Sequence, residues 1–475
     1  MAKNDIDDSE QAKKKNGFKN PSPYFIILIL IILSVVATWI IPSGEYDRVI
    51  DEATGREVVD PESFRYIERT PVGLFDALVA IPIGIKNQVG IISFIFIVSG
   101  AIAVIKETGA IDAGIIKLVD KFKGRDIPLL IVTMIICSLL GSLLGFAQEM
   151  IPFIAIGIAL ASGLGYDRVV GFHIVRTATW IGFAASTMNP FVVTVAQEMA
   201  ELPLLSGMGY RVIVYVVFMI ISGVFFLRYA KKVKKDPSKS ILYGYESEVD
   251  PKQFEVEERY TTFTTRHKLV LLIFVAGLIL LAYGAVKFDW GTNEMGAVLF
   301  GISIICGFIG GFGPNQIAQE FSKGMGLVTG GALIAGFTGA IAVILNQGQI
   351  LDTMIHGLSV PLANVSGVAT AVGMMIMYSF INFFIGSAAG RAAATLPIMI
   401  PLSDILGITR QTAVLAFIIG GGITNMLWPN MIYVLAFGDI PYNRWFKHIW
   451  KLVVYLMVAG AILIAIAHLI SYGPF

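Results

Sequence analysis

Two charged side chains, Glu149 and Arg391, stand in stretches of otherwise apolar and small residues. A charge at the centre of a bilayer costs at least about 2.5 kcal/mol, so such a side chain usually faces a cavity, a partner or a solute. An arginine can hold a carboxylate through two parallel hydrogen bonds, and a glutamate can hold a proton, a cation or an ammonium group. Together they would suit a zwitterion, whereas each alone could be the water-exposed tip of a turn.

Polar residues also flank a proline in two apolar segments. They are Ser186, Thr187 and Asn189 beside Pro190, and Thr424, Asn425 and Asn430 beside Pro429. Proline removes a helix hydrogen bond and leaves a carbonyl free. Unwound carbonyls with Ser, Thr and Asn oxygens are ligands for Na⁺, and helix N-termini attract carboxylates. The pattern predicts two breaks in membrane helices that bind substrate. The alternative is two simple kinks, whose free backbone groups bond to neighbouring helices. Candidate Na⁺ ligands are Ser186, Thr187, Asn189, Thr424 and Asn425.

Further polar residues lie near these positions. Ser387 and Thr395 are close to Arg391, and Gln148 precedes Glu149, although small residues also serve helix packing. One helix face carries His173, Arg176, Thr177 and Trp180. We expect this stripe to be structural, either as a polar face inside the protein or as an interfacial helix end.

The composition is that of an integral membrane protein, since 56% of residues are hydrophobic, 15% are charged and the mean hydropathy is +0.75. Cys137 and Cys306 both lie in apolar segments, which argues against a structural disulfide, and the sequence has no Cys/His metal spacing. It also has no evident nucleophile–base pair and no phosphate-binding glycine loop. We therefore expect no enzyme, no organic cofactor and no nucleic-acid partner.

Several apolar segments approach or exceed the roughly 20 residues that cross a bilayer as a helix. They lie near 24–42, 88–106, 127–146, 208–229, 269–287, 294–311, 327–345, 366–386, 410–438 and 447–471, with an amphipathic arm at 109–125. Lysine-rich residues 1–23 and the charged linker 231–266 are expected on the cytoplasmic side of a bacterial inner membrane. Three crossings, at 127–146, 168–199 and 208–229, separate the arm from the linker, so the two cannot both lie on that side. Re-entrant hairpins near 147–165 and 387–406 are the expected cause.

The two membrane halves, 24–230 and 267–475, share internal similarity. Gly100-Ala-Ile-Ala-Val-Ile105 recurs as Gly339-Ala-Ile-Ala-Val-Ile344, and Pro190 recurs as Pro429. Both pairs have the same interval of 239 residues (100 to 339, and 190 to 429). An apolar hexapeptide alone could match by chance, but a polar break at the same interval predicts a duplication. Interrupted segments at matching places in two halves indicate a transporter binding site.

The chain resembles the C4-dicarboxylate anaerobic carrier family, and its YfcC-like branch in particular, within the wider ion-transporter superfamily. The resemblance spans nearly the whole chain and is carried by GFAQEMIPF, ASTMNPF, GSAAGRAAATLPIMIPL and GGITNMLWPN. It implies an all-α polytopic membrane protein with an inverted repeat, two re-entrant hairpins, broken helices, a dimerising scaffold and elevator-type movement. Sodium-coupled relatives carry Ser-Asn-Thr at both hairpin tips, where this chain has FAQE and SAAGR. Members of this branch are often labelled basic amino acid antiporters.

These observations predict a secondary active transporter of a small carboxylate-bearing metabolite, coupled to Na⁺ or H⁺ or working by exchange. The substrate is a C4-dicarboxylate or an amino acid; a second basic residue would favour the dianion, and Glu149 facing the substrate would favour the amino acid. A basic amino acid antiporter and, outside transport, an ion channel are the alternatives. The expected partners are the substrate, the lipid bilayer and a second copy of the chain. The predicted substrate-binding residues are Glu149, Ser186, Thr187, Asn189, Ser387, Arg391, Thr395, Thr424, Asn425 and Asn430.

Overall fold

The computed structural model describes residues 22–50, 57–60, 62–122, 124–151, 153–246, 263–288, 290–363, 365 and 367–473. Residues 1–21 of the predicted tail, much of the charged linker and Pro152 therefore lie outside the described residues. The first half contains α2 (Pro23–Ile40), β1 (Gly44–Glu45), β2 (Arg48–Ile50), β3 (Glu57–Val59), β4 (Arg65–Tyr66), α3 (Leu74–Asn87), α4 (Val89–Glu107), α5 (Ala110–Lys121), α6 (Asp126–Leu139), η1 (Leu140–Leu144), η2 (Gln148–Met150), α7 (Phe153–Gly163), α8 (Arg168–Phe172), η3 (His173–Thr177), α9 (Ala178–Ala184), η4 (Pro190–Thr194), α10 (Val195–Met199) and α11 (Met208–Lys235).

The second half follows η5 (Pro237–Lys239) in the linker. It contains α12 (Thr265–Phe288), α13 (Thr292–Gly310), α14 (Pro314–Gln347), α15 (Leu351–Ala363), α16 (Val368–Phe384), α17 (Ala388–Ile405), α18 (Arg410–Thr424), α19 (Asn430–Ala436) and α20 (Tyr442–Leu469). Seven helices in the described residues are long and apolar enough to cross a membrane: α2, α4, α6 with η1, α11, α13, α14 and α20. The protein is thus a mostly helical, multi-span membrane protein.

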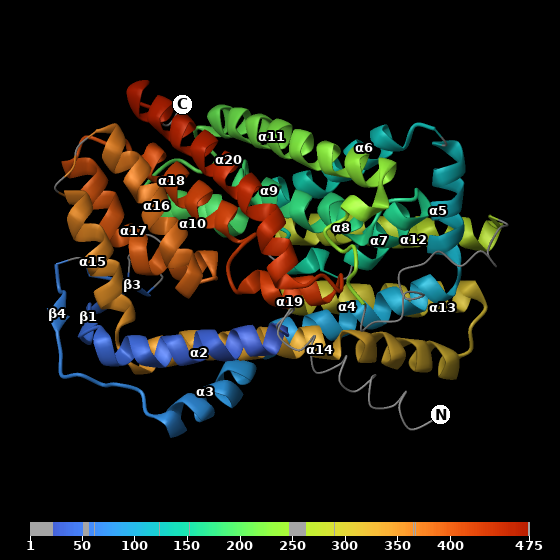
Figure 1. Ribbon diagram of the computed structural model, residues 1–475, viewed down its shortest axis with the longest axis horizontal. Helices are drawn as coiled ribbons and strands as arrows, with labels where there is room; N and C mark the ends of the chain where they lie inside the picture. Colours follow the sequence, from blue (N-terminus) through green and yellow to red (C-terminus); the bar gives the residue numbers. More distant parts are fainter. Residues whose placement is uncertain are drawn as a thin grey trace, which may run out of the picture.

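The longest helix, α14, forms one layer of the fold with α2, α3, α4 and α13 (Figure 1). Glycines let these backbones approach closely, as is common between membrane helices. A Cβ at Gly339 of α14 would lie 2.9 Å from the carbonyl oxygen of Gly84 on α3. A Cβ at Gly324, also on α14, would lie 2.9 Å from the Cα of Gly100 on α4. Side chains at these crossings would push the helices of this layer apart.

A second layer holds the helices between α5 and the linker, and those after α15. Here α6 and η1 pack on α9, α16 packs on α18, and α11 and α20 lie along the outer side (Figure 1). The helices α9 and α18 cross directly, because Gly422 lacks the Cβ that would overlap the backbone of Ala184. The connecting helices α5 and α15 lie at opposite ends of the molecule in this view.

Two helices of the second layer end at polar breaks. The helix α9 ends at Ala184, and the chain resumes as the π-helix η4 at Pro190. The helix α18 ends at Thr424, and α19 begins at Asn430. The arms of two hairpins lie beside these breaks: α6–η1 and α7 around residues 145–150, and α16 and α17 around residues 385–387. We call these two turns tip 1 (145–150) and tip 2 (385–387).

The structure corrects one expectation from the sequence. The fold is not all-α, because β1 pairs with β4 and β2 with β3 as short antiparallel ladders between α2 and α3. The segment 410–438 is divided where the sequence analysis placed a polar break, between α18 and α19. The helix α11 continues to Lys235, beyond residue 229 expected for that span, and the lysines of its last turn suit the negative end of a helix dipole.

Candidate functional site

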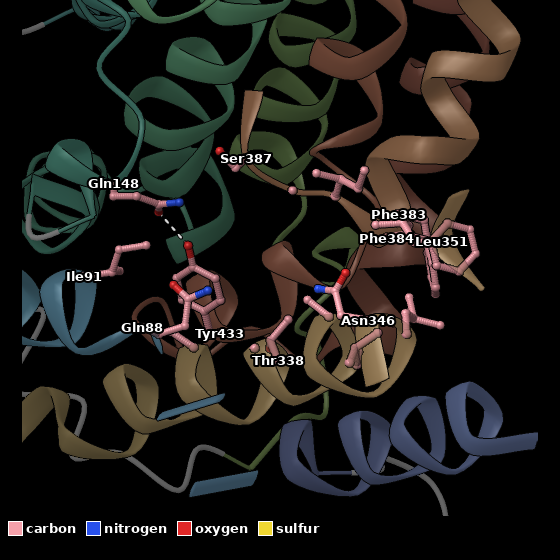
Figure 2. Close-up of a pocket in the computed structure, with 17 residues that line it drawn as sticks. Gln88, Ile91, Gln148, Thr338, Asn346, Leu351, Phe383, Phe384, Ser387 and Tyr433 are labelled. Carbon is pink, nitrogen blue, oxygen red and sulfur yellow. Dashed lines mark hydrogen bonds between the residues drawn. The ribbon is translucent and has the colours of Figure 1, made fainter. Parts of the chain in front are cut away.

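A cavity of about 400 Å³ lies between α14 and the two hairpin tips (Figure 2). It is lined by side chains from both layers, with Thr338 and Asn346 on α14 facing the tips. The polar lining residues are Gln88, Gln148, Thr338, Asn346, Ser387 and Tyr433. No charged residue of the described ranges lines it. A charged solute in this cavity would therefore have to interact with an oppositely charged side chain that lies behind the lining residues.

Tip 1 is held by an acid, a base and a tyrosine. The Ala147 amide donates to Glu149 Oε2 at 2.7 Å, and Arg176 Nη1 donates to the Ala147 carbonyl oxygen. The Tyr433 hydroxyl donates to Gln148 Oε1 at 2.6 Å, as the dashed line in Figure 2 shows. Tip 1 is thereby joined to α19, which lies 285 residues further along the chain.

Arg176 is fully buried beneath tip 1, and not all of its hydrogen-bond donors have acceptors in the described residues. Its Cζ lies 4.6 Å from the centre of the Trp180 ring, a cation–π contact. Its Nε and Nη2 have no hydrogen-bond partner within the described part of the chain. A buried guanidinium with unused donors carries a desolvation cost that an anion would relieve.

Tip 2 is held by Arg391, which is also buried. Its Nη1 donates to the Ile385 carbonyl oxygen at 3.2 Å and to Asn382 Oδ1. Its Cζ lies 5.0 Å from the centre of the Phe417 ring, and its Nε lacks a partner among the residues described. Gly421 makes room for the guanidinium, since a Cβ there would overlap Nη2. Arg391 thus lies directly behind a residue, Ile385, that lines the cavity.

Asn382 connects Arg391 to the second break. Its Nδ2 donates to Thr424 Oγ1 at 3.1 Å and to Asn425 Oδ1 at 3.0 Å. Its amide orientation follows from the network, because only its oxygen can accept from Arg391. In the first hairpin Ser142 makes a comparable contact, since its Oγ lies 3.1 Å from Thr187 Oγ1 at the first break.

The first break is closed by protein donors. Arg211 Nε donates to the Thr187 carbonyl oxygen at 3.0 Å, and Ser142 Oγ donates to the Ala185 carbonyl oxygen at 3.1 Å. Ser186 Oγ donates to the Phe183 carbonyl oxygen at 2.6 Å and accepts from Asn189 Nδ2 at 3.1 Å. The oxygens of this break therefore already receive hydrogen bonds, one of them from a buried cation.

The predicted Na⁺ ligands fit a cation poorly. Arg211 holds the Thr187 carbonyl oxygen, and the Asn382 amide points its N–H groups at Thr424 and Asn425. A guanidinium on the same oxygen would repel Na⁺. Within the described residues no group of three or more His, Cys, Asp or Glu side chains is placed to hold a metal either.

The predicted site residues fall into three places. Ser387 caps α17, accepting from the Gly390 amide at 3.3 Å, and is the predicted residue that lines the cavity. Arg391 and Glu149 lie behind the tips, and Thr395 Oγ1 donates to the Arg391 carbonyl oxygen at 2.6 Å. The buried break residues lie further from the cavity lining: Ser186, Thr187, Asn189, Thr424 and Asn425. Asn430 begins α19, and its side chain lies outside the described ones.

The predicted polar stripe on η3 and α9 is buried inside the protein. His173 Nε2 lies 2.9 Å from His448 Nε2 on α20, and His173 Nδ1 lies 3.0 Å from Thr177 Oγ1. Aromatic rings from α11 and α20 surround the imidazoles. Arg176 belongs to the same stripe, so the stripe includes a side chain that bonds to tip 1, one residue before Gln148 of the cavity lining.

Several site residues were missed from the sequence. Gln88, Thr338, Asn346 and Tyr433 line the cavity, and Asn382 and Arg211 organise the breaks. The sequence holds a signal for two of them, since Asn382 interrupts the apolar run MMIMYSFINFF and Arg211 enters the apolar span after Met208. The four lining residues have no such signal, because Gln88 and Asn346 lie at helix ends, where polar side chains are common, and a single Thr338 or Tyr433 inside a helix is unremarkable in sequence.

The multi-span helical fold and the internal polar cavity are those of a membrane transporter. A family model described as C4-dicarboxylate anaerobic carrier matches residues 21–469. The chain therefore belongs to the C4-dicarboxylate anaerobic carrier family, and it is a secondary transporter and not an enzyme. The expected family and the expected absence of enzyme activity are both confirmed.

Two curated relatives match over nearly their full length. YfcC of Escherichia coli (strain K12), which its name describes as a proposed basic amino acid antiporter, is 31% identical over 97% of this chain and 99% of its own. An uncharacterised protein of Haemophilus influenzae is 28% identical over 96% of this chain and 98% of its own.

Two solved structures are similar at lower identity. The Neisseria gonorrhoeae MtrF structure, whose title concerns a class of antimetabolite efflux pumps, is 17% identical with a TM-score of 0.43, covering 97% of both chains. The Alcanivorax borkumensis YdaH transporter is 16% identical with a TM-score of 0.41, covering 96% of this chain and 100% of its own.

Proposed function

We propose that this transporter moves a small carboxylate-bearing metabolite, a C4-dicarboxylate or an amino acid, and binds it in the cavity between α14 and the two tips. Arg391 is the proposed carboxylate ligand. Gln88, Asn346 and Ser387 are placed to orient the rest of the solute by hydrogen bonds. The name of the C4-dicarboxylate anaerobic carrier family supports the C4-dicarboxylate, and the name of the relative YfcC supports the amino acid.

One observation carries the carboxylate assignment. Arg391 is buried behind Ile385 with its Nε lacking a partner in the described residues, while the cavity in front holds no charged lining residue there. The site is therefore positive but locally uncompensated, and an anion is the solute that it favours. A movement of tip 2 that carries the Ile385 carbonyl aside would bring the carboxylate to the guanidinium.

The family resemblance extends this proposal to the mechanism. We propose that the halves are inverted repeats, that the two hairpins are re-entrant, and that the second layer moves against the first as an elevator. The glycine contacts support the duplication, because Gly84 with Gly339 and Gly324 with Gly100 are the same pair at intervals of 240 (84 to 324) and 239 (100 to 339). A homodimer through the first layer belongs to the same proposal.

The amino acid remains a second candidate because of Glu149. Its carboxylate is half-buried at tip 1, beside Gln148, which lines the cavity. An amino acid would place its carboxylate at Arg391 and its ammonium group at Glu149. This arrangement suits a zwitterion or a basic amino acid, in keeping with the name of the relative YfcC.

Thermal stabilisation of the purified protein tests the proposal. A ligand that binds only the folded state stabilises it by about 2.7 kcal/mol at a hundred times its Kd. We expect a rise in Tm with succinate, fumarate or aspartate in the wild type, and none in Arg391→Gln. Lys323→Gln, on the outer part of α14, is the matched control for removal of one cation. Stabilisation by arginine and lysine alone would select the amino acid, and no response to any of the five would defeat the carboxylate assignment.

A further inference from the structure

The cluster at tip 1 has charges that the proposed carboxylate site does not use. Glu149 Oε2 accepts from the Ala147 amide at 2.7 Å, and Arg176 Nη1 donates to the carbonyl oxygen of the same residue. The carboxylate and the guanidinium therefore hold the two ends of Ala147 and act on each other electrostatically. The next residue, Gln148, lines the cavity.

Arg176 has the features of an incomplete anion site. It is fully buried, and its Nε and Nη2 find no acceptor anywhere in the described ranges. Trp180 covers one face of the guanidinium at 4.6 Å, which leaves the planar edge for a ligand. A carboxylate matches that edge with two parallel hydrogen bonds.

Glu149 occupies the neighbourhood that such a carboxylate would enter. While it is ionised it partly neutralises Arg176 and repels a second negative charge, strongly so because the guanidinium is fully buried. Once protonated, Glu149 no longer repels the substrate, and its O–H becomes a hydrogen-bond donor. Occupation of Arg176 by a substrate carboxylate therefore favours a proton on Glu149.

The other titratable groups around tip 1 do not replace Glu149 in this role. Tyr433 on α19 feels the charges of both Arg176 and Glu149, but its hydroxyl is engaged with Gln148. On α4, which packs against η2, the titratable residues Lys106 and Glu107 lie in the last turn, whereas Ile91 in the first turn lines the cavity. Arg176 stays charged under all conditions of interest.

We infer that Glu149 is the proton-coupling residue of the carrier, and that one proton binds to it when a substrate carboxylate engages Arg176. The proton and the anion then move in the same direction. This inference rests on the proposed carboxylate site. It makes Arg176 the second anion-binding residue, at tip 1, as Arg391 is the first at tip 2.

Calorimetry with succinate tests the inference on the purified, full-length protein. Titrations in buffers of different ionisation enthalpy give the number of protons taken up per succinate bound. We expect about one for the wild type and about zero for Glu149→Gln, which should bind succinate with an affinity that no longer falls as pH rises. Glu149→Asp, which keeps the carboxylate, should restore the uptake. Glu320→Gln on α14, which removes a carboxylate paired with Lys323, is the control and should behave as the wild type.

A flux measurement separates coupling from binding. In proteoliposomes, Glu149→Gln should still exchange internal for external succinate, but should lose the accumulation that a pH gradient drives in the wild type. Zero proton uptake by the wild type, proton release in place of uptake, or undiminished uptake by Glu149→Gln would each overturn the inference while leaving carboxylate binding intact. A folded Glu149→Gln that no longer binds succinate would overturn it as well, because Glu149 would then be a ligand. Should that variant not fold, the wild-type proton count alone decides. Failure of the wild type to bind succinate, fumarate or aspartate would instead defeat the proposed function, and this inference with it.

Discussion

The two hairpin tips are alike in architecture and unlike in charge. Each has a buried arginine beneath it that bonds to a tip carbonyl, Arg176 to Ala147 and Arg391 to Ile385. At tip 1 an acid, Glu149, acts on the arginine, whereas the polar partner of Arg391 is the neutral Asn382. The same framework thus holds a compensated cation at one tip and an uncompensated cation at the other.

The backbone differs between the two halves in a related way. Within the described residues the first half contains three π-helices, at Leu140–Leu144, His173–Thr177 and Pro190–Thr194, whereas α16, α18 and α19 of the second half are α-helical throughout. Single-turn π-helices are frequent at functional sites. The one at His173–Thr177 carries Arg176. We interpret tip 2 as the anion site whose positive charge is constant, and tip 1 as the part in which the charge is adjusted.

The largest expected effect comes from the uncompensated cation. Arg391→Gln should weaken succinate binding by about 100-fold, since loss of one partner of a buried charged pair costs about 3 kcal/mol. Arg391→Lys should retain part of the affinity, because the charge remains but the planar fork is lost. Calorimetric Kd values check this, with circular dichroism to confirm folding. Equal effects of Arg391→Gln and Arg176→Gln would contradict the distinction between the tips.

A different arginine should affect stability and not affinity. Arg211 donates to the carbonyl oxygens of Thr187, Ser206 and Leu205, all at or near the first break. Arg211→Gln should destabilise the protein by about 2 kcal/mol, because buried carbonyls lose their donors. It should leave the succinate Kd within about twofold, because no residue described at the first break lines the cavity. A Kd shift as large as that of Arg391→Gln would show that the first break binds substrate directly.

The sequence predicted the positions of the chain breaks better than the residues of the cavity. Pro190 and Pro429 mark the breaks because proline acts locally, on the helix that contains it. The cavity depends on which helices meet in the fold. The hydrogen bond from Tyr433 to Gln148 is an example, because the sequence around either residue does not predict it. Arg176 also shows that local sequence does not predict which elements meet. Its helical spacing predicted a polar stripe, either inside the protein or at an interfacial helix end, but only the fold shows that the stripe is buried and that Arg176 bonds to tip 1.

A glycine beside tip 2, Gly421, allows a test of whether the position of the Arg391 guanidinium matters for binding. Gly421→Ala would place a Cβ against the Arg391 guanidinium, so the side chain must shift. We expect succinate binding to weaken by about tenfold, or about 1.4 kcal/mol, without loss of the arginine. Gly301→Ala on α13 adds the same methyl group into open space and should leave Kd unchanged. An unaltered Kd in Gly421→Ala would mean that the guanidinium position observed here is not the one that binds substrate.

The smallest expected effect is that of sodium. Arg211 already donates to the Thr187 carbonyl oxygen, and the Asn382 amide donates to Thr424 and Asn425, so both breaks are supplied with donors before any cation arrives. Replacing Na⁺ by choline at constant ionic strength should therefore change the succinate Kd by less than about twofold. A larger loss of affinity without Na⁺ would mean that the break oxygens exchange their protein donors for a cation. In that case Arg211→Gln, which frees the Thr187 carbonyl, should bind Na⁺ more tightly than the wild type.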